Sequence, residues 1–326
     1  MRLRRGLRVL RTGTDQVQIG TDPRWAVRLH GLSPSQCRAV LQGAERSLHP
    51  ALPEEVIDQL SRLGLTRPDR VRDAVVPARL LPDARTTALV CGSDPRMVRR
   101  RRAEAVVAVS GLGRTGVQIA CTLAASGIGT LLLDDPRPVT EPDTGTGLTP
   151  GEVGQRRHTV VARILRTTAP GVHVGSPGKV SATPTVMITV EADAVDPART
   201  LALASAGIPQ LPVVLREADA LVGPLAVSGG ACPRCVELAR ADLDPIWPQV
   251  LGLLCSADQD RPEPVVLAAV TGALAAAEAL ALIDGGQPVT RGHQYEIPLP
   301  TAEPRLRAWA AHPECGCAAL PSDLGT

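Results

Sequence analysis

Four cysteines form two tight pairs, Cys232-Pro-Arg-Cys235 and Cys315-Gly-Cys317. Thiolates on two short turns can complete a tetrahedral four-sulfur site of the kind that zinc prefers. Such a closed site leaves no position open for a substrate, so we expect it to hold the C-terminal segment against its domain. We therefore predict a structural zinc (Zn2+) at Cys232, Cys235, Cys315 and Cys317. A redox-active pair is the alternative, but it would leave the second pair unexplained.

A glycine-rich segment could bind phosphate. In Ala108-Val-Ser-Gly111-Leu-Gly113-Arg-Thr-Gly116, the pattern G-x-G-x-x-G follows an apolar strand and opens a helix. The first glycine permits a tight turn, the second lets backbone amides approach an anion, and the third lets the helix pack on the strand. Asp134 follows the next apolar strand, where an acidic residue is expected to bind ribose. The alternative is a turn of this shape that binds nothing.

The remaining cysteines occupy apolar stretches of sequence. We expect Cys37, Cys91, Cys121 and Cys255 to be ordinary core residues, with Cys255 the one kept as a candidate functional thiol. We see no signal peptide in the charged segment that begins at Met1, so we expect a cytoplasmic protein with reduced thiols.

The elements that must position these residues alternate between strand and helix from residue 103 onward. We expect strands at 105–109, 129–133, 172–175, 185–190 and 211–215, and helices at 116–125, 153–167 and 197–205. This alternation is typical of an α/β fold with a doubly wound, mostly parallel, Rossmann-like sheet. The apolar stretch 265–283 is interrupted by Thr271, Gly272 and Glu278, and we interpret it as a buried helix rather than a membrane span.

We expect three regions: 1–70, 71–102 and 103–326. Residues 1–70 combine short strands at 7–11, 16–19 and 26–29 with two helices, one after Ser33 and one at 53–63. Strands followed by two short helices favour a small winged-helix-like domain. We interpret 71–102 as a connector with a strand at 87–91 and a solvated basic run at 99–102.

The charge of the chain is nearly balanced. Its formal net charge is +2 over 326 residues, and 44% of the residues are hydrophobic. No overall field therefore points to nucleic acid or acidic lipid, although residues 1–72 carry more Arg than Asp plus Glu. We expect neither a membrane nor a nucleic acid as the main partner.

The glycine loop, the ribose aspartate and the later C-x-x-C together resemble the ThiF/MoeB-type (ubiquitin-activating-like) adenylating superfamily, from about residue 103 to Cys317. Glu152-Val-Gly-Gln-Arg-Arg157 is similar to its DVGxxK segment. The start of the chain resembles the peptide clamp of ThiF-like leader-peptide-binding proteins from thiazole/oxazole-modified peptide pathways. The resemblance implies a peptide or small-protein substrate docked as an added strand, a partner modifying enzyme and a homodimer.

Parts of the adenylation chemistry are missing from this resemblance. Adenylation needs cations on the triphosphate of ATP and a carboxylate that holds Mg2+. The family's NLxRQ segment reads Gly145-Thr-Gly-Leu-Thr-Pro here, and its lysine position carries Arg157. We expect Arg114 to supply one lost cation and Asp193 to be the metal-facing carboxylate.

These features predict a ThiF-like protein that binds a substrate or leader peptide and has a degenerate or weak ATP site. The alternative is an active ATP-dependent adenylyltransferase that activates a carboxylate. A DNA-binding regulator is a lesser alternative, and a nicotinamide dehydrogenase is the least favoured because its catalytic His or Lys is missing. The sequence assigns no catalytic residue.

Overall fold

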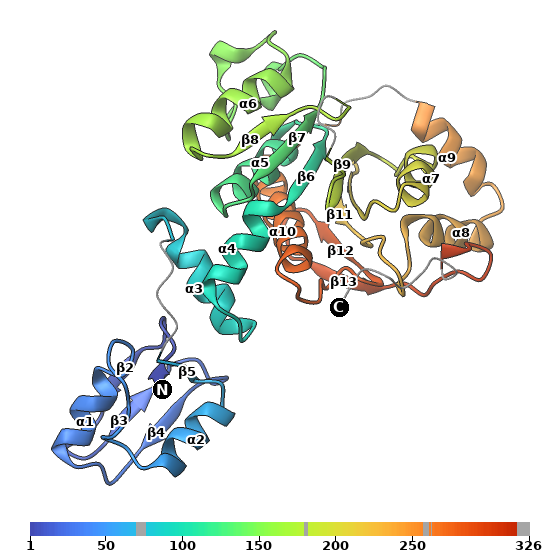
Figure 1. The fold of residues 1–326 in the computed structure, drawn as a ribbon. Helices are drawn as coiled ribbons and strands as arrows, with labels where there is room; N and C mark the ends of the chain where they lie inside the picture. Colours follow the sequence, from blue (N-terminus) through green and yellow to red (C-terminus); the bar gives the residue numbers. More distant parts are fainter. Residues whose placement is uncertain (70–75, 179–181, 257–260, 262, 318–326) are drawn as a thin grey trace. The chain divides into compact units, whose positions relative to one another are not determined.

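A computed structural model describes residues 1–69, 76–178, 182–256, 261 and 263–317. The chain divides into two compact units, Met1–Arg99 and Arg100–Thr326, both drawn in Figure 1. The boundary predicted between residues 70 and 71 lies outside the described residues and stays a prediction.

The first unit begins with short strands and two helices. Its elements are β1 (Arg2–Leu3), β2 (Val9–Arg11), β3 (Val17–Ile19), β4 (Val27–Leu29), α1 (Pro34–Leu41), α2 (Glu54–Arg62) and β5 (Thr66–Arg67). Strands β2, β3 and β4 form an antiparallel sheet in that order, and β1 pairs with β5. Ser33 starts α1 with a capping box, because its side chain accepts from the Gln36 amide while the Gln36 side chain accepts from the Ser33 amide. The winged-helix-like interpretation of these elements stays a prediction.

The predicted strand at 87–91 is wrong. A short 3-10 turn (Ala78–Leu80) leads into α3 (Leu81–Val90), which is followed by α4 (Pro95–Glu104). Ala84 and Ala88 are buried four residues apart, on one face of α3, which is the spacing of a helix. The apolar and β-branched residues near the end of this segment suggested a strand, but the packing of the alanine face decides the structure.

The second unit is built on an eight-stranded sheet with the order β13-β12-β11-β10-β9-β6-β7-β8. The strands are β6 (Val106–Ser110), β7 (Thr130–Asp134), β8 (His173–Gly175), β9 (Val186–Ala192), β10 (Gln210–Leu215), β11 (Asp219–Val222), β12 (His293–Pro298) and β13 (Arg305–Ala308). Strands β6 to β10 are parallel, and β11 to β13 continue the sheet antiparallel. The predicted mostly parallel sheet is therefore confirmed.

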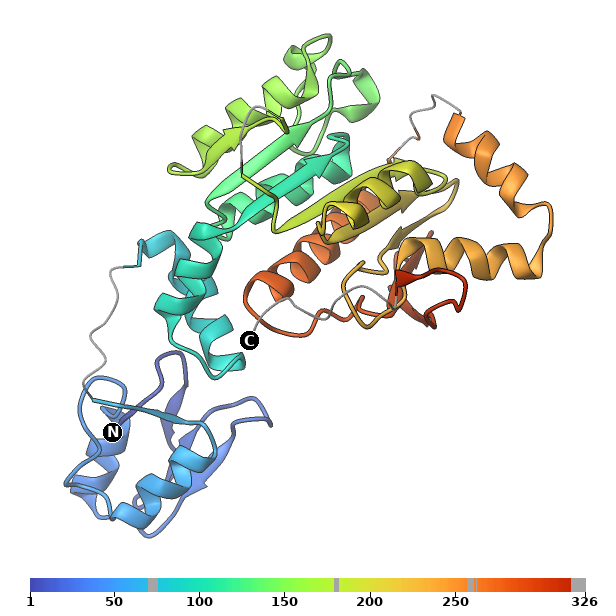
Figure 2. The same cartoon turned by 45° about the vertical axis from the view of Figure 1, so that its right-hand side comes forward.

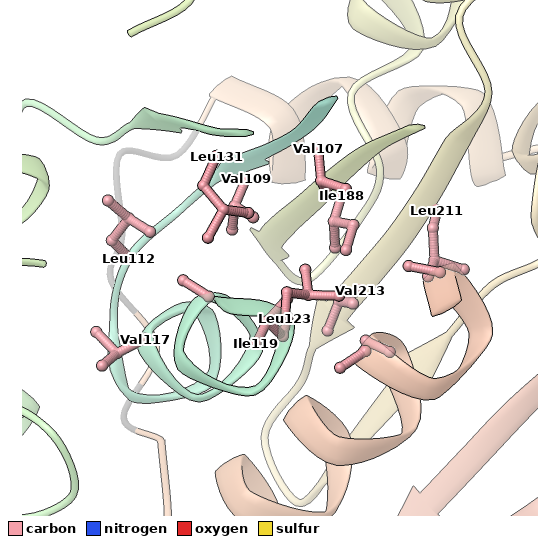
Figure 3. Packing of buried hydrophobic residues seen from close by; sticks show 14 of the residues in the cluster. Val107, Val109, Leu112, Val117, Ile119, Leu123, Leu131, Ile188, Leu211 and Val213 are labelled. Atoms are coloured by element: carbon pink, nitrogen blue, oxygen red, sulfur yellow. The ribbon is translucent and has the colours of Figure 1, made fainter. Parts of the chain in front are cut away.

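The two faces of this sheet pack against different helices, which can be followed in the turned view of Figure 2. Val107 and Val109 of β6 lie in the main core with α5 (Arg114–Ala125) and α10 (Val265–Ile283), as seen close up in Figure 3. Ala108, between them, packs with Met187 and with Leu203 of α7 (Pro197–Ser205) instead. This alternation follows from the two-residue period of a strand, and it buries both faces of β6.

Helix α10 is long and apolar enough to cross a membrane, but half of its apolar window is buried inside the protein. The backbone amide and hydroxyl of Thr290 both donate to the buried Glu278 carboxylate at 2.7 Å. Because it packs against α5 and the sheet, α10 is a core helix, as its sequence predicted.

The remaining helices are α6 (Arg157–Thr168), α8 (Pro233–Leu243) and α9 (Trp247–Ser256). Helix α6 begins later than expected, because Pro150–Glu152 form a 3-10 turn and Gly154 has a φ of 86°. The basic run was predicted to be solvated, and this is wrong for Arg102. Its guanidinium is buried and pairs with Asp284 at 2.7 Å.

Candidate functional site

The glycine loop has the close contacts that its motif predicts. Gly111 has a φ of 84°, and a Cβ there would lie 2.4 Å from the Val190 carbonyl oxygen. A Cβ on Gly116 would lie 1.8 Å from the Gly111 carbonyl oxygen. No larger residue fits at either position unless the backbone moves, so both glycines let the loop lie tightly between β6, β9 and α5.

A cavity of about 400 Å³ lies beside this loop. Because β6 pairs with β7 on one side and β9 on the other, the crevice at their carboxyl ends is a topological switch point, where ligands of such sheets bind. Its lining includes Gly111, Gly113 and the exposed Asp134, whose carboxylate accepts from Ser110 Oγ at 3.3 Å. Asp134 is thus placed where the ribose role requires, and that role stays a prediction.

A carboxylate from the chain itself lies on the glycine loop. Oε2 of Glu263 accepts a hydrogen bond from the Thr115 backbone amide at 2.5 Å, in the first turn of α5. A Cβ on Gly113 would lie 2.0 Å from Glu263 Oε1, so the absence of a side chain at Gly113 makes room for this carboxylate. Burial raises the pKa of the Glu263 carboxyl even though Thr115 donates to it. Sequence reasoning missed Glu263.

Arg114 does not line the cavity described here. Its guanidinium donates to two backbone oxygens, the Thr144 carbonyl at 2.5 Å and the Glu263 carbonyl at 2.9 Å. The side chain that we expected to supply a cation to the nucleotide therefore joins the loop to two neighbouring segments.

Arg157 is buried in an ion-pair network beneath the loop. It pairs with Asp143 at 2.7 Å and with Asp135 at 3.3 Å, and Asp135 also accepts from the Leu112 amide at 2.8 Å. Burial opposes ionisation of Asp135, but the Arg137 guanidinium and the Leu112 amide hold its pKa below the usual range. Arg157 thus supports the loop through Asp135 and lies outside the cavity lining.

Asp193 has a φ of 64°, and its carboxylate accepts from Arg261 Nε at 2.7 Å. Arg261 lines the cavity, whereas Asp193 is not among the described lining residues. At the end of β9 it is Glu191 that lines the cavity, and it accepts from the Asp196 amide at 2.8 Å and from Arg199 at 3.1 Å. Burial raises the pKa of Glu191. Its position at the carboxyl end of a parallel strand was the available sequence signal.

The four predicted metal ligands converge. The sulfur atoms of Cys232, Cys235, Cys315 and Cys317 all lie within 4.8 Å of one another. The Cys232–Cys235, Cys232–Cys315 and Cys235–Cys317 sulfurs are 3.7, 3.4 and 3.3 Å apart. Four thiolates about 2.3 Å from a zinc ion would lie roughly 3.8 Å apart, so the cluster is close to the geometry that such an ion requires. Helix α8 begins at Pro233, directly between the first two ligands.

Two of the other four cysteines differ from expectation. Cys37 is buried and Cys121 half-buried, but Cys91 and Cys255 are exposed, so the core prediction is wrong for these two. Cys91 ends α3, and Cys255 lies in the last turn of α9, which buries none of its residues. Cys255 also lines the cavity. Partial burial of its sulfur and the carboxylates of Asp196 and Glu191 raise the pKa of this thiol, which disfavours the reactive thiolate.

Comparison with known proteins identifies the fold. No protein-family model matches the chain, and no curated protein matches it. The crystal structure of E. coli MccB with ATP is similar with a TM-score of 0.72 and 19% identity, covering 97% of this chain and 99% of MccB. The microcin C7 biosynthetic enzyme MccB in complex with N-formylated MccA is similar with a TM-score of 0.72 and 16% identity, covering 97% of this chain and 99% of MccB. The crystal structure of PaaA is similar with a TM-score of 0.69 and 16% identity, covering 93% of this chain and 98% of PaaA. The chain has the fold of MccB and PaaA.

Proposed function

We propose that this chain is a ThiF/MoeB-type protein of a peptide-modification pathway. It binds a substrate or leader peptide through its N-terminal region, residues 1–70, and its ATP site is weak or degenerate. The observation that carries the proposal is that the likeness to MccB covers 97% of the chain. It therefore includes most of the Met1–Arg99 unit as well as the nucleotide fold, and MccB has been crystallised with N-formylated MccA.

The three-stranded sheet of the first unit supports docking by strand addition. Strands β2 and β4 are its two ends, so each offers a backbone edge to an extended peptide. Leu10 in β2 is 42% exposed, and Arg28 in β4 is also exposed. Backbone hydrogen bonds along such an edge supply affinity, and neighbouring side chains supply selectivity.

Peptide binding is tested by fluorescence anisotropy with labelled precursor peptides encoded beside the gene for this chain. The zinc-loaded full chain is expected to bind one of them, and removal of residues 1–70 is expected to abolish binding while the zinc content is retained. Unchanged affinity after this removal would overturn the proposal.

The proposal of a weak ATP site is supported by two arginines that are already bound within the protein. Arg114 binds backbone oxygens and Arg157 is held by two aspartates, so both guanidinium groups already have partners inside the protein.

The four-cysteine cluster holds zinc as a structural staple, which leaves no open coordination position for chemistry. A homodimer, a partner modifying enzyme and a cytoplasmic location complete the proposal.

The alternative is an active ATP-dependent adenylyltransferase that uses Mg2+. The glycine loop, the position of Asp134 and the fold shared with MccB favour it. Pyrophosphate exchange that disappears in Asp134→Ala and Gly113→Glu is the expected result of this alternative. Exchange that survives both changes would exclude this cavity as its active site.

A further inference from the structure

Two residues that follow α9 hold the rim of the cavity, and we call Arg261 and Glu263 the strap. Arg261 pairs with Asp193 at 2.7 Å and with Glu217 at 3.5 Å. Glu263 is held through its carboxylate by the Thr115 amide and through its carbonyl by Arg114. These contacts join the strap to the glycine loop on one side and to the end of β9 on the other.

The carboxylate of Glu263 occupies an anion position. The first amides of a helix have no partner within the helix, and together with the helix dipole they attract negative charge. Phosphates bind glycine loops through these same amides. Because Glu263 Oε2 is 2.5 Å from the Thr115 nitrogen and Oε1 fills the space above Gly113, a phosphate on these amides would overlap the carboxylate.

We propose that the Glu263 carboxyl group is a built-in ligand of the glycine loop, and that nucleotide phosphate binds there only after Glu263 has moved away. This inference deepens the proposed function, because it rests on the weak nucleotide site and names what weakens it. The block is local to the loop, because the rest of the cavity lining carries both carboxylates and guanidinium groups, namely Asp134, Glu191, Asp196, Arg137, Arg199 and Arg261.

The direct test is a calorimetric titration of the zinc-loaded full chain with Mg-ATP, in the wild type, Glu263→Gln and Glu263→Ala. Glu263→Ala removes the competing ligand, and affinity should rise on the order of tenfold or more, as expected for loss of a competing buried hydrogen bond. Glu263→Gln should give a smaller gain, because its amide oxygen can still accept from Thr115.

The matched control is Glu217→Gln. Glu217 also contacts Arg261, but its side chain is 76% exposed and it does not reach the loop. Its neutralisation should change affinity by less than about twofold, as for other exposed pairs. Equal gains in ATP affinity in the Glu217 and Glu263 variants would mean that any loss of negative charge near the cavity has this effect, and this would overturn the proposal. So would unchanged, weaker or undetectable binding by Glu263→Ala.

Hydrogen exchange of the backbone gives a second readout. The Thr115 amide should exchange faster in Glu263→Ala than in the wild type, and Mg-ATP should restore its protection. Equal exchange in both proteins would overturn the proposal. Peptide affinity is measured separately, so that the two proposals can fail independently. Tighter ATP binding by Glu263→Ala without any peptide binding would contradict the proposed function alone. Peptide binding together with an ATP affinity that Glu263→Ala leaves unchanged would contradict the role of Glu263 alone.

Discussion

The cysteine cluster and the glycine loop are two ligand sites that this chain completes in opposite ways. The cluster brings four sulfurs from distant segments to within 4.8 Å of one another, a set of donors that can hold a metal ion. The glycine loop brings amide donors to the end of β6, but the chain supplies its own carboxylate to them through Glu263. A motif therefore indicates that a site can form, whereas the residues that converge on it decide whether it is open.

The largest effect on stability is expected when the four-cysteine cluster is broken. Cys315→Ser removes one of four thiolates, and because structural zinc binding contributes on the order of 10 kcal/mol in small domains, we expect a loss of more than about 3 kcal/mol in the free energy of unfolding. Bound zinc should be lost in parallel, as measured by metal analysis and thermal unfolding. Cys91→Ser is the control, since Cys91 is exposed and outside the cluster. Full stability of metal-free Cys315→Ser would show that the cluster is no staple.

The second effect tests whether Arg157 is structural. Asp143→Ala leaves this buried guanidinium without its closest partner and should lower the free energy of unfolding by about 3–5 kcal/mol. Arg163→Ala is the control, because that side chain is 58% exposed in its pair with Glu152 and should contribute less than about 1 kcal/mol. Equal, small effects in chemical denaturation would return Arg157 to the candidate nucleotide ligands.

The third prediction compares the stability cost of adding a side chain at two glycines of the glycine loop. Gly116→Ala places a Cβ against the backbone oxygen of Gly111, and Gly113→Ala places one against the end of the Glu263 side chain. Overpacking of this kind costs about 1–3 kcal/mol, with the higher value expected at Gly116 because a backbone cannot swing away. A double-mutant cycle should show that Glu263→Ala rescues Gly113→Ala and leaves Gly116→Ala unchanged. Rescue of neither variant would contradict the position of Glu263.

The smallest effect is a pH dependence. Burial raises the pKa of Glu263 in the folded chain, so folding favours its protonated form. As pH rises above 4.5, the ordinary pKa of a Glu carboxyl, the wild type should therefore lose stability relative to Glu263→Gln, because the folded carboxyl must ionise against its burial. Denaturation curves at several pH values measure this difference. A wild type that gains stability relative to Glu263→Gln as pH rises would have the wrong sign for this account.

Local patterns predicted much of the fold and the cysteine cluster. Strand and helix periodicity located the parallel sheet, and cysteine spacing located the two cysteine pairs, because each signal depends on residues close together in sequence. The strand expected at 87–91 failed because the packing of Ala84 and Ala88 outweighs local propensity. Glu263 was not predicted because it lies about 150 residues from the glycine loop, and only tertiary packing brings the two together.

The state of the glycine loop is tested most directly by calorimetric titration of the wild-type, zinc-loaded chain with Mg-ATP. If Glu263 holds the site closed, binding should be undetectable or weaker than about 1 mM. Micromolar binding that Asp134→Ala abolishes would contradict this account, because the site would then be open with its own carboxylate in place, and adenylation would become the favoured activity.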